Sequence, residues 1–334
     1  MVAFSERNEM MWRANILLLV ISLTCESITS SQYTPGKKSL GELPYSNSQQ
    51  ADSNFKPTVT HPTYVKVHPK VLFDGAHNNS SVSLRQYAPF ISLTSKDGYK
   101  ITTGTEKFST GSLKQYSVLI IVNASGPEGH RDAPAFTDEE CDAVRDWVSR
   151  GGALLLVTDQ APYSAAASSL SKRFGVDLTI GYTIDKVHYN KDANDQTELV
   201  FTRADGLVVN HPITNGYHAD ERIDRVISFT GTSVKGPTNS VAFLKLSDTA
   251  FDVLPAEIKP GSGNGAAQEP RLVSAAGRAQ GVAFELGKGR AVFLSEAAML
   301  TAQVTPQGVN FGMNVAGFDN SQLALNIMHW LSGK

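Results

Sequence analysis

Cysteine is scarce in this chain of 334 residues, which contains only Cys25 and Cys141. Removal of an N-terminal signal would leave Cys141 alone, so an intramolecular disulfide is excluded. No Cys/His pattern fits a structural zinc site either. Cys141 lies in a predicted amphipathic helix, where a free cysteine usually behaves as a small buried hydrophobe. We therefore interpret Cys141 as a core residue.

Long runs of one charge and long apolar runs are also absent. The formal net charge is −2 and there is no long basic run, so nothing indicates binding to nucleic acid. The mostly apolar run at 16–23 is far shorter than the roughly 20 residues that cross a bilayer, so no transmembrane span is expected. The content of 41% hydrophobic and 19% charged residues suits a soluble globular protein with a real core.

Residues 1–30 resemble a secretory signal peptide. Arg7 and Arg13 precede the apolar run, and small polar residues follow it. The expected location is therefore secreted or periplasmic. Acylation of Cys25, as in a bacterial lipoprotein, is a less favoured alternative, because the residues before it fit the lipoprotein pattern poorly.

The remaining chain divides by composition. Residues 31–69 are rich in Ser, Gln, Asn, Thr and Pro, which predicts a flexible linker or arm. Residues 70–334 are expected to form one α/β domain of alternating strands and helices. Within it, strand-like pieces separated by turn residues predict an irregular, antiparallel insertion at 176–260.

One strand–helix–strand unit is well marked. Thr137 and Glu140 form a capping box at the start of a helix, Gly151 and Gly152 end it, and the apolar run 153–157 follows. A wholly apolar strand is typical of a central parallel strand that is covered on both faces.

These patterns resemble the class I glutamine amidotransferase-like superfamily. The match is nearest to uncharacterised exported bacterial proteins with an amidotransferase-like domain of unknown function, and it covers roughly residues 70–334. The resemblance implies a flavodoxin-like fold: a mostly parallel sheet flanked by helices, here with the antiparallel insertion. It rests on the stretches 71–79, 147–156, 210–213, 295–299 and 320–331.

The sequence departs from that superfamily at the nucleophile. Glutamine amidotransferases place a cysteine in a tight turn after a central strand, and here the corresponding turn is Thr158-Asp159-Gln160. Cys141 belongs to the preceding helix. The resemblance thus implies the fold, but the chain is not expected to be a functional glutamine amidotransferase.

Three predicted strands end in a carboxylate: Asp74, Asp159 and Glu296. Ligands of an open parallel α/β sheet bind beyond the carboxyl ends of its strands, so these acids are expected at one edge of the sheet. We predict Asp159, Glu296 and His77 as catalytic residues. Asp74, His77 and Asp159 could alternatively bind a divalent cation, because carboxylate and imidazole supply suitable lone pairs.

Each of these residues also has a structural interpretation. Asp74 is suited to capping backbone amides of the turn that contains His77. Asp159 is suited to the N-cap of the next helix, and Glu296 to the positive end of a helix. The sequence leaves both interpretations open.

Several amides accompany the acids. Amide groups both donate and accept hydrogen bonds, which suits neutral polyols such as glycans, although an ordered loop uses them equally well. The predicted substrate-binding residues are Asn78, Asn79, Gln160, Gln303 and Asn314.

The sequence is therefore compatible with two functions. The first is an extracytoplasmic hydrolase of an ester, lactone or glycan-type substrate, whose strand-end carboxylates activate water directly or through a divalent cation. The second is a non-catalytic module that binds a glycan or another polar small molecule. The first is preferred because three acids at one edge repel each other unless a cation or protons offset the charge. The sequence does not indicate an oligomeric state.

Overall fold

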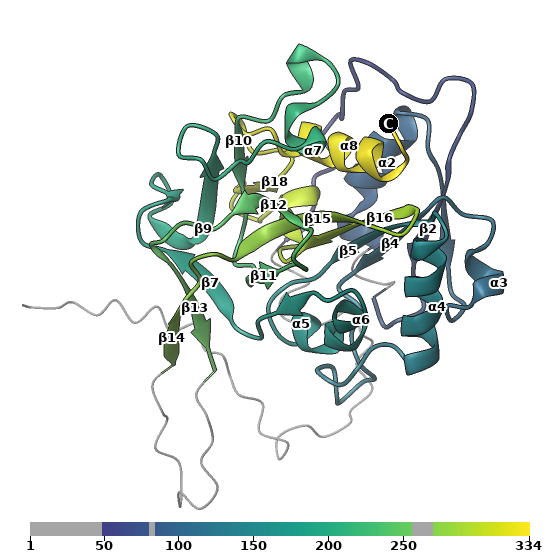
Figure 1. The fold of residues 1–334 in the computed structure, drawn as a ribbon. Helices are drawn as coiled ribbons and strands as arrows, with labels where there is room; N and C mark the ends of the chain where they lie inside the picture. The colour runs from purple at the N-terminus through teal and green to yellow at the C-terminus, as the bar shows by residue number, and fades with distance from the viewer. Residues whose placement is uncertain (1–48, 80–83, 256–269) are drawn as a thin grey trace, which may run out of the picture. The chain divides into compact units, whose positions relative to one another are not determined.

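Five parallel strands form the centre of a nine-stranded sheet (Figure 1). The structure, a computed structural model, describes residues 49–79, 84–255 and 270–334, so the predicted signal peptide lies outside it. The strands have the spatial order 2-1-3-4-5, which confirms the predicted flavodoxin-like α/β fold. In spatial order they are β3 (Lys100–Gly104), β2 (Lys70–Asp74), β4 (Val118–Val122), β5 (Ala153–Val157) and β16 (Gly289–Leu294).

Every residue of β4 and β5 is buried, because helices cover both faces of the sheet. Successive side chains point to opposite faces, so Leu154 and Leu155 belong to two separate hydrophobic clusters. Both faces of these strands therefore contribute to a hydrophobic core, which explains their continuous apolar sequence. The cluster around Leu155 includes α2 (Ala88–Lys96) and α8 (Asn320–Leu331), and the cluster around Leu154 includes α4 (Asp138–Ser149) and α6 (Ser168–Arg173).

Helix α4 begins at the predicted capping box. Thr137 Oγ1 accepts from the Glu140 amide at 3.3 Å, and Glu140 Oε2 accepts from the Thr137 amide at 3.0 Å. After the helix, Gly151 has φ +119°, a conformation that residues with a Cβ rarely adopt. The chain then enters β5 in parallel with β4.

The second half of the chain is mainly antiparallel, as predicted for the insertion. It extends the central sheet beyond β16 and adds two smaller three-stranded sheets. The extension contains β15 (Ala279–Leu286), β11 (Val234–Lys235), β6 (Asp177–Leu178) and β12 (Val241–Lys245). The smaller sheets contain β8 (Tyr189–Asn190), β9 (Asp195–Thr202) and β10 (Arg225–Ile227), and β7 (Tyr182–Asp185), β13 (Ala250–Leu254) and β14 (Arg271–Ser274).

The segment before β2 packs on the domain. Strand β1 (Gln50–Ala51) pairs with β17 (Ala302–Val304), which in turn pairs with β18 (Asn310–Gly312). Tyr64 donates to Ser332 Oγ at 2.7 Å. These contacts join Gln50–Ala51 and Tyr64 to the domain, and residues 31–48 of the predicted linker lie outside the described residues. Strand pairing uses backbone groups that every residue except proline supplies, so the polar composition does not signal it.

Short helical turns complete the described chain. In that part of the chain, no helix is both long and apolar enough to cross a membrane. These turns are α3 (Thr110–Leu113), α5 (Tyr163–Ala166), α7 (Pro212–Asn215), η3 (Ala219–Glu221) and η4 (Ala298–Leu300).

Candidate functional site

The acids that end β2, β5 and β16 fall into two sets with different partners. Asp74, at the end of β2, contacts His77. Asp159 and Glu296 follow β5 and β16, which are adjacent parallel strands paired through Val157 and Leu294. The charge of Asp159 acts on Glu296, so these two carboxyl groups form an interacting pair.

The first set is a closed network around His77. His77 Nδ1 lies 2.9 Å from Asp74 Oδ1, and His77 Nε2 lies 3.1 Å from Glu140 Oε1. Asp74 is fully buried, and His77 and Glu140 are at most 5% exposed. The ring centroids of Phe108 and Phe136 each lie 4.6 Å from the ring centroid of His77. Aromatic groups therefore cover parts of the imidazole that the carboxylates do not contact.

The imidazole of His77 is held in its charged form. Burial lowers the pKa of His77, but the hydrogen bonds and charges of Asp74 and Glu140 outweigh it, and the pKa is raised. Burial likewise raises the pKa of Glu140, but hydrogen bonds and the charge of His77 bring it below its ordinary value. The imidazolium of His77 therefore links Asp74 at the end of β2 to Glu140 in α4. This geometry favours the structural interpretation of Asp74 and His77, because both ring nitrogens already face a carboxylate.

The second set has no such cation among the residues that the structure describes. Glu296 is fully buried, with Oε1 accepting from the Ala298 amide at 2.7 Å and Oε2 from the Met299 amide at 2.8 Å. Asp159 is partly exposed and accepts from the Gln160 amide at 2.8 Å. The two acids thus close the turns after their strands, and of these two residues only Asp159 is partly exposed.

Burial changes the protonation of this pair. It raises the pKa of Asp159 to about 7, although backbone amides oppose the shift. Burial and then the charge of Asp159 raise the pKa of Glu296 well above its ordinary value. Both carboxyl groups therefore keep a proton to a higher pH than exposed carboxyl groups would.

Residues that the sequence did not single out complete the surroundings of Glu296. The hydroxyl of Tyr87, a buried residue, donates to the Ala297 carbonyl at 2.7 Å. A Cβ on Gly231 would lie 2.5 Å from Glu296 Cβ, so only glycine fits there. Its neighbour Thr230 has φ +59°, which is strained for a β-branched residue. No sequence signal links these residues to Glu296, because they come from distant segments.

Most of the predicted substrate-binding amides serve the fold. Asn78 donates to the carbonyls of Ser125 and Gly126, and Asn79, which is buried, donates to Asp74 Oδ2 at 3.0 Å. Gln160 is partly exposed, and its side chain has no hydrogen-bond partner in the part of the chain that the structure describes. Of the predicted substrate-binding amides near the carboxyl edge, Gln160 is therefore the one without a partner among the described residues.

Gln303 and Asn314 hold the small sheet of β1, β17 and β18 together. Gln303 is 2% exposed and donates to Thr301 Oγ1 at 2.7 Å. Asn314 donates to Asp52 Oδ2 and to the Gln303 carbonyl. Their amide nitrogens thus serve this sheet, and the predicted role in binding a glycan finds no support in the geometry.

The predicted metal ligands do not come together. Among residues 49–79, 84–255 and 270–334, no group of three or more His, Cys, Asp and Glu side chains is arranged to hold a metal ion. Asp74 and His77 bind each other, whereas Asp159 pairs with Glu296. A divalent cation on Asp74, His77 and Asp159 thus has no ready-made site there.

Comparison with known proteins supports the fold and does not identify an activity. No protein-family model matches the sequence, and no curated protein sequence does. The structure is similar to the mmIFT52 N-terminal domain, with 14% identity, a TM-score of 0.52, and coverage of 79% of this chain and 98% of that one. At that identity the likeness shows the fold alone.

Two further solved structures show a weaker likeness. A ThuA-like protein from Bacteroides uniformis has 16% identity, a TM-score of 0.42, and coverage of 81% of this chain and 95% of that one. A GMP synthase-like protein from Thermoplasma acidophilum has 7% identity, a TM-score of 0.40, and coverage of 80% and 95%. No conclusion about this chain rests on them.

Proposed function

We propose that the protein is an extracytoplasmic hydrolase in which Asp159 is the general base and Glu296 is its neutral, protonated partner. The observation that carries the proposal is the position and state of Asp159. Asp159 is a partly exposed residue at the carboxyl end of a central strand, and burial of its carboxyl group raises the pKa to about 7. A base with a pKa near neutrality is well matched to removing a proton from water.

Glu296 would act through Asp159 without touching the substrate. It is fully buried, and its proton removes the repulsion that two adjacent carboxylates would otherwise feel. We propose that this proton, and not a metal ion, offsets the negative charge of the pair. In the described part of the chain, no third metal-ligating side chain joins Asp159 and Glu296. Glu296 is thus a positioning residue, and Asp159 is the catalytic one.

The proposed reaction is the attack of water on an ester, lactone or glycan-type bond. Asp159 would accept a proton from the attacking water, the oxygen of that water would bond to the electrophilic carbon, and the leaving oxygen would depart. The proton held by Asp159 then goes to the leaving group, which restores the carboxylate. Gln160 lies at the same turn, with a free amide that could orient the substrate.

The proposal places the chain in the amidotransferase-like superfamily, without its thiol chemistry. Cys141 is buried on α4 in the same hydrophobic cluster as Val144 and Leu170, and burial raises the pKa of its thiol. A buried, protonated thiol is a poor nucleophile. Export through the predicted signal peptide at 1–30 remains part of the proposal.

A non-catalytic binding module is the second candidate, and a specific observation favours it. Of the four predicted catalytic or metal-binding groups, Asp74, His77 and Glu296 are almost completely enclosed. A single partly exposed acid, Asp159, is compatible with binding a polar ligand but provides few groups for catalysis. The two candidates differ in whether a substrate is turned over.

Turnover by wild type and Asp159→Asn separates the candidates. The substitution keeps the shape of the side chain and removes the base, so hydrolysis of a responsive ester, lactone or glycoside should fall at least about 100-fold. Asp192→Asn, at an exposed turn, is the matched control and should retain full activity. Hydrolysis that survives in Asp159→Asn removes Asp159 from the mechanism. A wild type that is inactive on all three classes, but binds one of them, supports the second candidate.

A further inference from the structure

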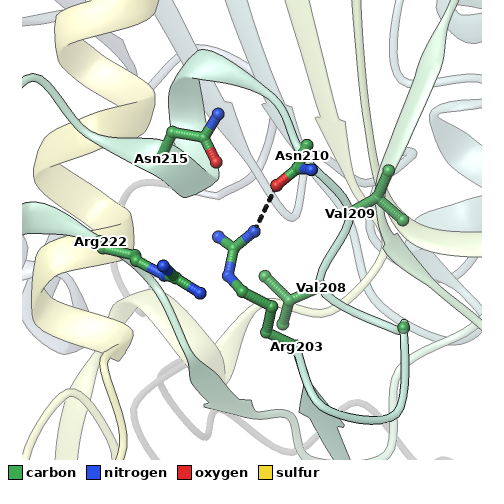
Figure 2. Close-up of a pocket in the computed structure, with 7 residues that line it drawn as sticks. Arg203, Val208, Val209, Asn210, Asn215 and Arg222 are labelled. Carbon is green, nitrogen blue, oxygen red and sulfur yellow. Dashed lines mark hydrogen bonds between the residues drawn. The ribbon is translucent and has the colours of Figure 1, made fainter.

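A polar hollow lies between the loop that follows β9 and the segment that follows α7 (Figure 2). Its volume is about 720 Å³, within the range of about 300–1,000 Å³ found for small-molecule sites. Neither Asp159 nor Glu296 lines it. Figure 2 shows the guanidinium groups of Arg203 and Arg222 and the amides of Asn210 and Asn215 gathered around this hollow.

Arg203 is held rigidly at the base of the hollow. Its Nε and Nη2 donate to the Ile223 carbonyl at 3.1 and 2.9 Å, and Nη2 also donates to the Thr214 carbonyl at 2.6 Å. Nη1 donates to Asn210 Oδ1 at 2.6 Å. A guanidinium has five N–H groups, so one on Nη1 remains free. Because the side chain is only 15% exposed and already ordered, a ligand that binds it loses little side-chain entropy.

Arg222 offers a second, more open group. Its Nε donates to Asp224 Oδ1 at 3.0 Å, which leaves the two terminal nitrogens free, and the side chain is 56% exposed. Two free terminal nitrogens match the two oxygens of a carboxylate. Arg203 and Arg222 carry two positive charges, and Asp224, which contacts both, carries one negative charge, so the local charge is +1.

The amides complete the recognition set. Asn210 accepts from Arg203 and keeps its amide N–H groups free, and the Asn215 side chain has no hydrogen-bond partner among the described residues. Amides that can both donate and accept suit hydroxyl groups. The combination of a guanidinium fork with free amides is suited to a molecule that carries both a carboxylate and hydroxyls.

We propose that this hollow binds an acidic sugar, with its carboxylate on Arg222 and its hydroxyls on Asn210 and Asn215. Arg203 contributes a fixed positive charge and one N–H. The site is separate from Asp159, so it does not depend on the proposed hydrolysis. It would let the protein hold a uronate-containing glycan whether or not the chain cleaves it.

Calorimetric titration of the purified full chain tests the proposal with D-glucuronate, D-glucose and glucose 6-phosphate. Glucuronate should bind, glucose should bind at least about tenfold more weakly, and added salt should weaken the glucuronate complex because exposed charges are screened. Equal binding of glucose, or tighter binding of glucose 6-phosphate, would overturn the acidic-sugar assignment. No binding of glucuronate would overturn the site.

Two variants locate the site without disturbing the fold. Arg222→Gln removes an exposed guanidinium, and Asn215→Ala removes an exposed amide. Arg222→Gln should weaken glucuronate binding about tenfold and Asn215→Ala by a smaller factor, with unchanged melting temperatures. Arg150→Gln, at an exposed arginine that ends α4 and does not line the hollow, is the matched control. Unchanged affinity in Arg222→Gln places glucuronate elsewhere and refutes the site.

Discussion

Two sets of buried acids at the same edge of the sheet differ in how their charge is balanced. Asp74 and Glu140 enclose His77, so an imidazolium lies between two carboxylates. Among the described residues no cation contacts Asp159 or Glu296, and burial, with the charge of Asp159 acting on Glu296, raises both pKa values. A cation between two carboxylates stabilises their contact, whereas a buried acid pair without a cation binds a proton more tightly, and Asp159 then titrates near neutral pH.

The largest expected effect comes from breaking the first set. His77→Ala leaves Asp74 and Glu140 buried without a cation, so we expect the free energy of unfolding at neutral pH to fall by about 3–5 kcal/mol. Chemical denaturation measures it. The loss should shrink in mild acid, because protonated carboxyl groups need no cation. His130→Ala, at an exposed turn, is the control. A loss that does not change with pH would show that His77 contributes packing alone.

The second set should be sensitive to the space beside Glu296. Gly231→Ala places a methyl group 2.5 Å from Glu296 Cβ and 2.6 Å from the Ser295 carbonyl oxygen. One of these groups must move, so we expect a destabilisation of up to about 3 kcal/mol in thermal or chemical unfolding. Gly111→Ala, where the nearest atom would be 3.7 Å away, should have little effect. Equal stabilities for the two variants would contradict the tight fit.

The pH dependence of the free energy of unfolding reports on the raised pKa of Asp159. Folding raises the pKa of Asp159 from an ordinary 3.8 to about 7, so the folded chain holds this proton more tightly than the unfolded chain. The free energy of unfolding should therefore fall as pH rises from about 4 to about 7, by about 2 kcal/mol after allowance for solvent contact.

His77 adds to this trend at higher pH. Its pKa is raised on folding, so its contribution is complete below about 6.5 and is lost as pH rises through the folded pKa. Denaturation at about pH 5 and about pH 7 should show the fall in the wild type and a flatter profile in Asp159→Asn. A profile that is identical in both proteins would show that Asp159 has an ordinary pKa.

The smallest expected effect is that of Glu296→Gln. Glu296 Oε1 and Oε2 each accept from a backbone amide, and the nitrogen of Gln cannot accept, so one of these hydrogen bonds is lost and we expect the free energy of unfolding to fall by about 1 kcal/mol. The pKa of Asp159 should also stay near 7, as carboxyl NMR titration can measure. Glu140→Gln removes a charged partner of His77 and should cost more, about 1.5–3 kcal/mol. The reverse order would contradict the assigned charge states.

Much of the fold follows from local patterns. The wholly apolar runs of β4 and β5, the capping box at Thr137 and the glycines after α4 lie where the sequence predicts them. These signals are strong because each depends on neighbouring residues and on the periodicity of one element. The sequence does not indicate the pairing of β1, because its partner, β17, lies about 250 residues away.

The roles of the polar residues depended on distant partners. The sequence places Asp74 and His77 in one turn, but it identifies Glu140 only as part of a capping box. The contact between Glu140 and His77 joins positions that are 63 residues apart. Gly231 and Tyr87 have no local signal that points to Glu296. Hydrogen-bond partners across a fold are set by the packing of whole elements, so sequence spacing could not assign them.

The amino-acid sequence by itself determined the parallel α/β sheet and the strand-end positions of Asp74, Asp159 and Glu296, because hydrophobic periodicity and capping act over a few residues. Only the tertiary structure decided which acid meets a cation and which keeps a proton. That choice depends on what lies within hydrogen-bonding distance after folding and on how much water remains there. It leaves Asp159 as the one of these three strand-end acids that is partly exposed.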